Sequence, residues 1–181
     1  LESAGPIIWG VRLNSSQSPG AWRTIIYEKG SWILHMLRHR MGDDRFLRML
    51  AELRERYQYQ SVTTEDFREL AAGFLPPNSV DSSLESFFDN WVYSTGIPTL
   101  RLKSTVRGKP PKVQLTATLS QSGAGEDFSI YVPVVVQARS GKPIVKWLET
   151  GDQPVSFEMT LRQLPVKVEL DPGNSILAVR E

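Results

Sequence analysis

The only two histidines of the chain are spaced as a pair that could bind a metal ion. His35 and His39 lie four residues apart in the segment HMLRH, and on a helix this spacing places both imidazole rings on one face. In zinc hydrolases of this pattern a glutamate follows the first histidine as general base, whereas Met36 holds that position here. Arg38 would oppose a bound cation, and Glu28 lies two turns upstream. We therefore interpret both residues as ordinary surface histidines and expect no metal site in this chain.

Other common catalytic patterns are missing from the sequence. The chain has no cysteine, which excludes disulfides, thiolate metal sites and cysteine nucleophiles. The segment GSW at 30–32 lacks the first half of the G-x-S-x-G turn that presents a catalytic serine. The glycine-rich segment SQSGAGED at 120–127 opens no helix, so we do not expect a phosphate-binding loop. The charged segments RHRMGDDR and ELRERYQYQ are expected to be solvated helix faces with supporting ion pairs.

Tyr27 is a further candidate because of its neighbours. It precedes Glu28 and Lys29 within an expected helix, and Gly30 leaves a stretch of backbone unshielded where close packing could occur. Judged by these residues alone, Tyr27 is expected to face the core with its hydroxyl group satisfied by a hydrogen bond. The residues by themselves therefore favour a structural role for this tyrosine.

Helical periodicity positions these residues in the first half of the chain. Apolar residues recur at spacings of three and four, which predicts amphipathic helices. Thr63 and Asp66 have the spacing of a capping box at the start of the third helix. In the second helix the expected buried stripe consists of Phe46, Leu47, Leu50, Leu53 and Tyr57. The four helices are expected at about residues 21–41, 43–58, 63–72 and from 81 to just before Gly96.

The second half of the chain has the two-residue periodicity of strands. Turn residues separate the runs about every 10 to 12 residues, which is typical of an antiparallel, immunoglobulin-like β-sandwich. Pro133 lies inside the longest run and is expected at an edge or a bulge, because proline cannot donate to a sheet ladder. The seven runs are TLRLKSTV, KVQLTATL, FSIYVPVVVQA, IVKWLET, VSFEMTL, VKVEL and ILAVR. The expected fold is thus multi-domain, with a helical subdomain at 1–97 and a β-sandwich at 98–181.

Composition and charge narrow the possible partners. The chain has 181 residues, of which 40% are apolar, and its 21 basic and 20 acidic residues give a net charge of +1. This balance predicts no broad electrostatic surface for nucleic acid or an anionic membrane. No apolar run reaches the roughly 18 residues of a membrane-spanning helix. The first residue is Leu rather than Met, so we expect a piece of a longer protein and make no prediction of its compartment.

Several segments together resemble the later half of the catalytic domain in gluzincin zinc aminopeptidases. This family includes aminopeptidase N and leukotriene A4 hydrolase. The likeness is specific over residues 21 to about 102, and the sandwich resembles the third domain of the family more weakly. The matching segments, in the order and at the spacing of the family, are YEKG at 27–30, LR at 37–38, GD at 42–43, TTEDF at 63–67 and WVYSTGIP at 91–98.

The resemblance implies a catalytic role for Tyr27 in place of the structural one. In the family this tyrosine projects into the active site and donates a hydrogen bond to the oxyanion of the tetrahedral intermediate, while zinc polarises the scissile carbonyl. Glu28, Lys29 and Gly30 match the remaining positions of the motif, and we assign no chemical step to them. The HExxH zinc site and the exopeptidase segment of the family are not in this chain. Zinc ligands are therefore expected outside it, and the isolated chain is expected to be inactive.

Two functions remain open at this point. In the first, the chain is part of a zinc aminopeptidase, and its partners are the peptide substrate and the rest of the catalytic domain. In the second, the chain comes from a noncatalytic relative whose helices and sandwich serve as a scaffold or interaction module. An HExxH segment upstream of Leu1 would favour the enzyme, and its absence would favour the scaffold.

Overall fold

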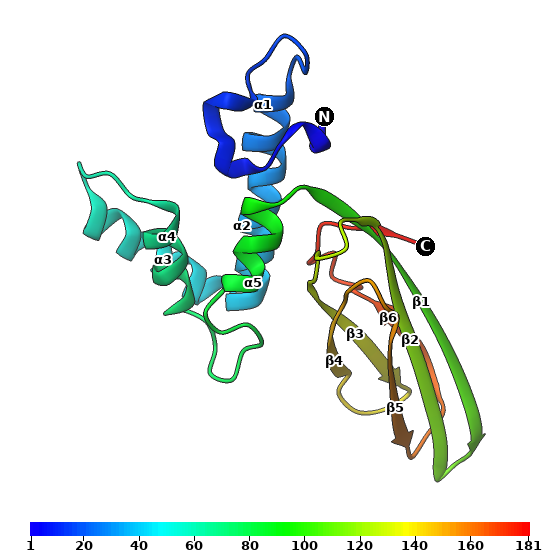
Figure 1. Cartoon of the computed structure of the whole chain (residues 1–181). Coiled ribbons are helices and arrows are strands. Elements are labelled where there is room, and N and C mark those ends of the chain that lie inside the picture. Colours follow the sequence, from blue (N-terminus) through cyan, green and yellow to red (C-terminus); the bar gives the residue numbers. More distant parts are fainter. The chain divides into compact units, whose positions relative to one another are not determined.

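A computed structural model describes the backbone of residues 1–181 and every side chain except that of Glu2. The chain divides into two compact units, Leu1–Thr95 and Gly96–Glu181. Helices make up the first unit and strands make up the second (Figure 1). This order confirms the fold class expected from the change in hydrophobic periodicity.

The first unit begins with two short 3₁₀ segments, η1 (Glu2–Ala4) and η2 (Ile7–Leu13), and continues into a long helix. The long helix consists of α1 (Ala21–Arg23), the π-helical segment η3 (Thr24–Lys29) and α2 (Gly30–Met41). Its total extent is that expected from the apolar pattern. The π-helical turn in its middle was not expected, because the three- and four-residue spacing of apolar residues does not distinguish an α-turn from a π-turn.

Three further helical segments complete the first unit. They are α3 (Asp43–Tyr57), α4 (Thr64–Ala72), and α5 (Glu85–Phe88), which continues as the π-helical η4 (Asp89–Tyr93). The capping box at the start of α4 is confirmed, since Asp66 donates its backbone N–H to the Thr63 hydroxyl and accepts the Thr63 backbone N–H. Helix α3 buries Phe46 and Met49, whereas Leu47 is 59% exposed. The expected stripe on α3 was therefore partly wrong, because its inward face is centred on Met49.

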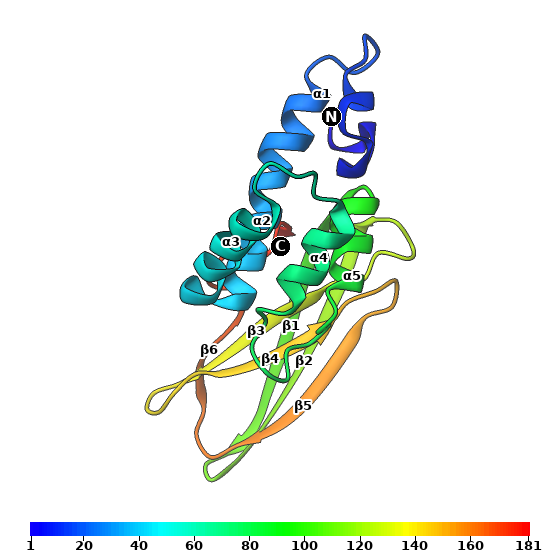
Figure 2. The same cartoon turned by 90° about the vertical axis from the view of Figure 1, so that its left-hand side faces the viewer.

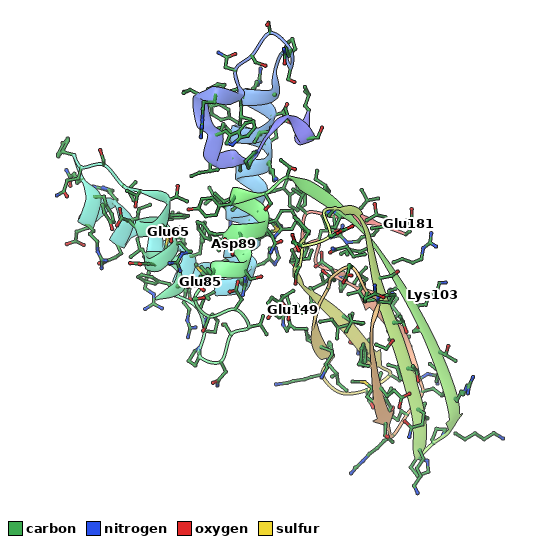
Figure 3. All side chains as sticks on the ribbon, in the orientation of Figure 1. Glu65, Glu85, Asp89, Lys103, Glu149 and Glu181 are labelled. Atoms are coloured by element: carbon green, nitrogen blue, oxygen red, sulfur yellow. The ribbon has the colours of Figure 1, made fainter. Side chains whose placement is uncertain are left out.

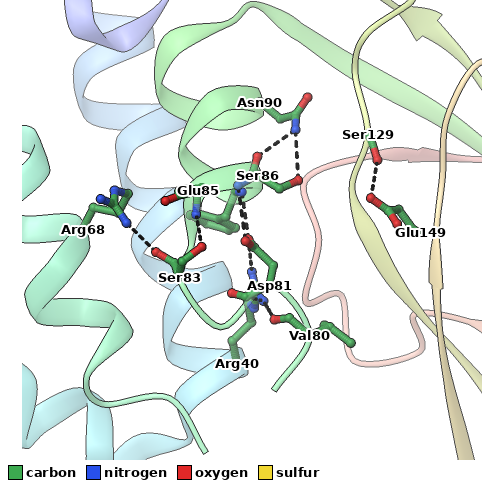
Figure 4. Close-up of polar contacts among 11 residues, drawn as sticks. Arg40, Arg68, Val80, Asp81, Ser83, Glu85, Ser86, Asn90, Ser129 and Glu149 are labelled. Carbon is green, nitrogen blue, oxygen red and sulfur yellow. Dashed lines mark hydrogen bonds and ion pairs between the residues drawn. The ribbon is translucent and has the colours of Figure 1, made fainter. Parts of the chain in front are cut away.

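The last helix starts later than its periodicity indicated. Asp81 precedes the helix and accepts hydrogen bonds at its carboxylate from the backbone N–H groups of Ser86 (3.3 Å) and Phe87 (2.9 Å) (Figure 4). Leu84 adopts a left-handed backbone conformation with φ of 59° immediately before the first helical residue. Residues 81–84 therefore form a capping turn, and the helix begins at Glu85.

The second unit contains two β-sheets. The four-stranded sheet has the order β5-β2-β1-β7, and the three-stranded sheet has the order β4-β3-β6. All pairs are antiparallel except β1 with β7, which is parallel and departs from the purely antiparallel expectation. The strands are β1 (Gly96–Lys109), β2 (Lys112–Ala124), β3 (Tyr131–Ala138), β4 (Ile144–Glu149), β5 (Val155–Leu161), β6 (Pro165–Leu170) and β7 (Val179–Arg180).

Alternating residues of the central strands form the core of the second unit. On β2 the inward residues are Val113, Leu115, Ala117 and Leu119, and on β3 they are Val132, Val134 and Val136. Each of these side chains is at most 2% exposed. This alternation is the pattern from which the strands were predicted.

Pro133 lies in the central strand β3, and the pairing of β3 with β4 has no register shift there, so the expected edge or bulge position was wrong. It pairs with Trp147 of β4. On the other side of β3 the pairing with β6 ends at Val134 and Leu170, and the Pro133 carbonyl accepts the N–H of Asp171. In an antiparallel sheet the N–H and C=O of one residue point toward the same neighbouring strand. The side on which Pro133 lacks an N–H is therefore the side of β6, where the strand pairing has already ended. The proline therefore removes no ladder bond.

Candidate active site

Tyr27 lies on the π-helical turn η3, with its side chain outward. Within this turn Ile25 and Lys29 occupy the inward positions, at 0% and 6% exposure. Tyr27 is 61% exposed. The expectation that Tyr27 faces the core is therefore wrong, because the apolar Ile25 and the stem of Lys29 fill that side of the helix.

The Tyr27 ring is supported by a second aromatic side chain. The rings of Tyr27 and Trp22 are in T-shaped contact, at a centroid distance of 5.3 Å and an interplanar angle of 80°. No described residue forms a hydrogen bond with the Tyr27 hydroxyl group. The arrangement thus presents a packed phenol ring whose O–H is available as a hydrogen-bond donor to a group outside the described chain.

Lys29 joins the π-helical turn to the end of the last helix. Its ammonium group donates a hydrogen bond to the carbonyl of Ser94, the residue that follows η4, over 3.4 Å. A cation placed at carbonyls that end a helix is electrostatically favourable, and burial of the long apolar stem adds packing. This contact brings together two of the sequence segments singled out above, YEKG and WVYSTGIP. The sequence identified Lys29 only as part of the YEKG motif and did not predict this hydrogen bond, because Ser94 lies 65 residues away.

The same helix end is fixed from a second side by α4. The Tyr93 hydroxyl donates to one carboxylate oxygen of Glu65 (2.6 Å), and the Arg68 guanidinium donates to the other (2.7 Å). Glu65 lies on the helical unit, as labelled in Figure 3. The hydrogen bond from Tyr93 lowers the pKa of the Glu65 carboxyl, and Arg68 lowers it further. The same bond to Glu65 raises the pKa of Tyr93.

Gly30, the last residue of the YEKG segment, does not pack closely against any described residue. A methyl group added at its Cα would have the Ile25 carbonyl oxygen as its nearest neighbour, at 4.0 Å. The described residues therefore do not use the close packing that a glycine would allow at this position. Gly30 instead borders an apolar groove of about 310 Å³. The groove is lined by Ile7, Gly30, Ile33, Leu34, Val62, Thr63, Thr64, Phe67, Phe88 and Val92.

The two histidines lie on α2 beyond Tyr27. Their ring centroids are 4.5 Å apart, and the His35 ring is also in T-shaped contact with the Trp32 ring. A hollow of about 270 Å³ beside them includes Arg38 and Asp43, whose side chains form a bidentate pair at 2.8 and 2.9 Å. This pairing lowers the pKa of the Asp43 carboxyl. Across the described residues, no three histidine or carboxylate side chains are placed to hold one metal ion.

None of the described helices combines the length and the apolar character needed to cross a membrane.

The candidate site consists of Tyr27 on its π-turn, the Lys29 side chain that ties this turn to Ser94, and the apolar groove that Gly30 borders.

Comparison with known proteins points to one family. A sequence profile described as the Peptidase family M1 domain matches residues 2–101. The chain is 23% identical over 168 residues to aminopeptidase N of Escherichia coli strain K12, a match that covers 90% of this chain and 18% of that protein. It is 28% identical over 123 residues to Transcription initiation factor TFIID subunit 2 of Saccharomyces cerevisiae, covering 59% of this chain and 8% of that protein.

A solved structure shares the fold. Aminopeptidase A of Legionella pneumophila, crystallised in complex with aspartic acid, superposes with a TM-score of 0.65 at 21% identity. The match covers 94% of this chain and 18% of that one. The chain thus spans less than a fifth of the length of each of these relatives.

Proposed function

The chain belongs to peptidase family M1, and we propose that it is part of a longer zinc-dependent aminopeptidase that releases amino-terminal residues from peptides. The family match confirms the resemblance found in the sequence segments. In this proposal residues 1–97 are the carboxy-terminal part of the catalytic domain and residues 98–181 form the β-sandwich that follows it. The partners of the chain are the peptide substrate and the rest of the catalytic domain.

Tyr27 carries the chemical part of the proposal. As a nucleophile adds to the scissile carbonyl, negative charge develops on its oxygen, and a donor fixed in advance stabilises that charge more than it stabilises the ground state. The Tyr27 phenol meets this requirement, because Trp22 holds its ring and no described residue competes for its hydroxyl group. The exposed, unpartnered hydroxyl on an anchored π-turn is the observation that supports this role best.

Lys29 supports Tyr27 indirectly. Its buried ammonium group ties η3 to the Ser94 carbonyl, so the turn that presents the phenol is fixed to a second helix. Glu28 is exposed and receives no chemical step.

Among the described side chains of this chain, no group is placed to form a zinc site. Met36 replaces the general-base glutamate beside His35, and Asp43 is engaged by Arg38. In the proposed enzyme the zinc ligands therefore belong to a part of the protein outside this chain, and we derive no step through the metal from the residues described.

The groove beside Gly30 is consistent with a partner segment from the same catalytic domain. Leu34 and Val62 at its border are 42% and 44% exposed, and the Cα of Gly30 leaves room for close packing. Apolar side chains grouped around a groove are stabilised when another surface covers them. This supports the proposal that the remainder of the catalytic domain packs there.

A second candidate function is favoured by one comparison. The similarity to a subunit of a transcription initiation factor shows that this sequence pattern also occurs in a protein that is not named as a peptidase. In that case the helices and the sandwich act as a scaffold or interaction module, and Tyr27 has no catalytic partner.

Metal analysis of the full-length protein that contains this chain separates the two functions. The enzyme proposal expects one zinc per chain after dialysis, together with hydrolysis of aminoacyl-amide substrates that stops on chelation and returns with zinc. A full-length protein that is folded, free of zinc and inactive on all aminoacyl amides would favour the scaffold and overturn the enzyme.

A further inference from the structure

Basic residues predominate at one end of the second unit and acidic residues at the other. One end is formed by three turns: β1–β2 at 107–112, β3–β4 at 139–143 and β5–β6 at 162–164. We call it the turn end. Lys109 pairs with Lys112, and the pairing of β2 with β5 ends at Val113 and Leu161, next to Arg162. The side chains of Ser140 and Gln163 hydrogen-bond at 3.3 to 3.4 Å, which joins the second turn to the third. The three turns lie at the same end of the unit in Figures 1 and 2.

The turn end carries only positive charge. Its three turns contain six basic residues and no aspartate or glutamate. All six side chains are exposed, and none of them forms an ion pair with a described residue. They are Arg107, Lys109, Lys112, Arg139, Lys142 and Arg162.

The opposite end collects most of the acidic residues. Two basic residues there are neutralised locally, since Arg101 pairs with Glu181 and Arg180 pairs with Asp171. Figure 3 labels Glu181, and it also labels Lys103 on strand β1. The acidic residues at this end are Glu126, Asp127, Glu149, Asp152, Asp171 and Glu181.

Distance keeps the two ends electrostatically separate. Strand β2 has 13 residues, and at about 3.3 Å per residue it spans roughly 40 Å. The Debye length at physiological ionic strength is about 8 Å, so the acids of one end do not cancel the cations of the other. The net charge of +1, from which we expected no electrostatic surface, thus conceals a strongly basic patch.

The apolar residues at the turn end indicate the kind of anionic partner. Leu164 is 53% exposed and lies two residues from Arg162. Pro110 and Pro111 are exposed between Lys109 and Lys112. The three turns contain no aromatic residue on which a nucleic-acid base could stack. Basic side chains around an apolar tip suit a lipid bilayer, where cations contact the headgroups and the apolar group enters the interface.

We propose that the turn end of the second unit binds an anionic phospholipid surface. The turn end belongs to the second unit and Tyr27 to the first, and the inference does not depend on the proposed aminopeptidase activity. Each basic side chain near such a surface contributes a roughly fivefold factor to partitioning. Arg107, Lys109, Lys112 and Arg162 would contact headgroups while Leu164 inserts beside them.

Vesicle sedimentation with the 181-residue chain tests the proposal. We expect binding to vesicles of phosphatidylcholine with about a third phosphatidylserine, and none to phosphatidylcholine alone. Raising the ionic strength from about 0.1 to 1 M shortens the Debye length from about 10 to 3 Å and should release the protein. The triple variant Lys109→Gln, Lys112→Gln, Arg162→Gln should lower partitioning about a hundredfold.

A matched control separates the patch from net charge. The triple variant Arg48→Gln, Arg54→Gln, Lys103→Gln removes the same charge from exposed sites elsewhere and should bind anionic vesicles nearly as well as the unchanged protein. Equal losses in both triple variants, or equal binding to neutral and anionic vesicles, would overturn the proposal.

Leu164→Ser distinguishes a bilayer from other polyanions. It should weaken vesicle binding about tenfold, because the apolar contribution is lost, and leave binding to duplex DNA unchanged. Unchanged vesicle binding by this variant would contradict the lipid assignment. Tighter binding of the unchanged chain to duplex DNA than to anionic vesicles at one ionic strength would also contradict it.

Discussion

Replacement of Asp81 by alanine is expected to destabilise the helical unit severely. The side chains of Asp81 and Arg40 are only 6% and 8% exposed and form an ion pair at 3.5 Å. The Asp81 carboxylate also accepts the backbone N–H groups of Ser86 and Phe87, so it caps α5 as well as neutralising Arg40 (Figure 4). The alanine variant removes both functions at once.

The magnitude follows from what the substitution leaves behind. Removing one partner of a buried ion pair costs about 3 to 5 kcal/mol, because the remaining charge stays buried. Arg40 retains hydrogen bonds to the Val80 and Asp81 carbonyls and lies over the Phe87 ring at 5.6 Å, which favours the lower part of that range. Asp81→Asn keeps an acceptor for one backbone N–H and should cost about 1 kcal/mol less than alanine. Domains of this size have total stabilities of only about 5 to 15 kcal/mol.

Chemical denaturation followed by far-ultraviolet circular dichroism measures this effect on the helical signal. Glu55→Ala is the control, because Glu55 is an exposed carboxylate on α3, and its loss should change the free energy of unfolding by no more than about 0.5 kcal/mol. A double-mutant cycle with Arg40→Met should show strong coupling to Asp81. If Asp81→Ala lowered the free energy of unfolding by less than about 1 kcal/mol, the buried pair and cap would not have the roles assigned here.

Three further outcomes are expected. Thr63→Ala should lower the stability of the helical unit by about 1 kcal/mol in denaturant titrations, because the capping box of α4 loses its hydroxyl acceptor; unchanged stability would contradict the cap. Because the pKa of Glu65 is lowered, its contribution to stability is fully present above the ordinary carboxyl pKa of about 4 and is lost as the pH falls through the lowered pKa. Because the pKa of Tyr93 is raised, its contribution is fully present below the ordinary pKa of about 10 and is lost as the pH rises through the raised pKa. Melting temperatures across pH should decline at both extremes, and Tyr93→Phe should flatten the alkaline decline. The 181-residue chain alone should hold no stoichiometric zinc after dialysis; one tightly bound zinc that is lost in a His35→Ala, His39→Ala variant would show that the histidine pair is a metal site after all.

Sequence periodicity was sufficient to predict most helices and strands, but not the long-range contacts between their side chains. The α-helices and the strands were visible as local repeats of apolar residues, and the Thr63–Asp66 capping box was visible because both residues are close in sequence. The 3₁₀ segments η1 and η2 were not predicted. Arg40 belonged to a segment that we interpreted as a solvated face. Its partner Asp81 lies 41 residues away, so neither the burial of the pair nor the late start of α5 could be inferred from local spacing.

The same limit applies to the candidate site. The resemblance to a family singled out Tyr27, but the residues alone predicted a buried tyrosine, because the π-turn that exposes it has no local signature. Lys29 received no partner for the same reason that Arg40 did not. The position of Pro133 in the sheet was also not predictable from local sequence. Its effect on a sheet depends on where the neighbouring strand ends, and that register is a property of the tertiary structure.

Net charge was informative about the whole chain and uninformative about its surfaces. Nearly equal numbers of acidic and basic residues, 20 and 21, are compatible with an even distribution and with a concentration of each sign at one end. Only the strand order and register, which bring the three turns together, distinguish these cases.

The proposed oxyanion role of Tyr27 is tested by the turnover number of a Tyr27→Phe variant of the full-length protein on an aminoacyl-amide substrate. We expect kcat to fall roughly a hundredfold to a thousandfold, as on loss of one oxyanion donor, while KM, zinc content and melting temperature change little. Tyr59→Phe, which removes the hydroxyl of a tyrosine that is 98% exposed, should leave all four quantities unchanged. A Tyr27→Phe enzyme with full turnover and a lowered melting temperature would contradict the catalytic assignment and return Tyr27 to a structural role.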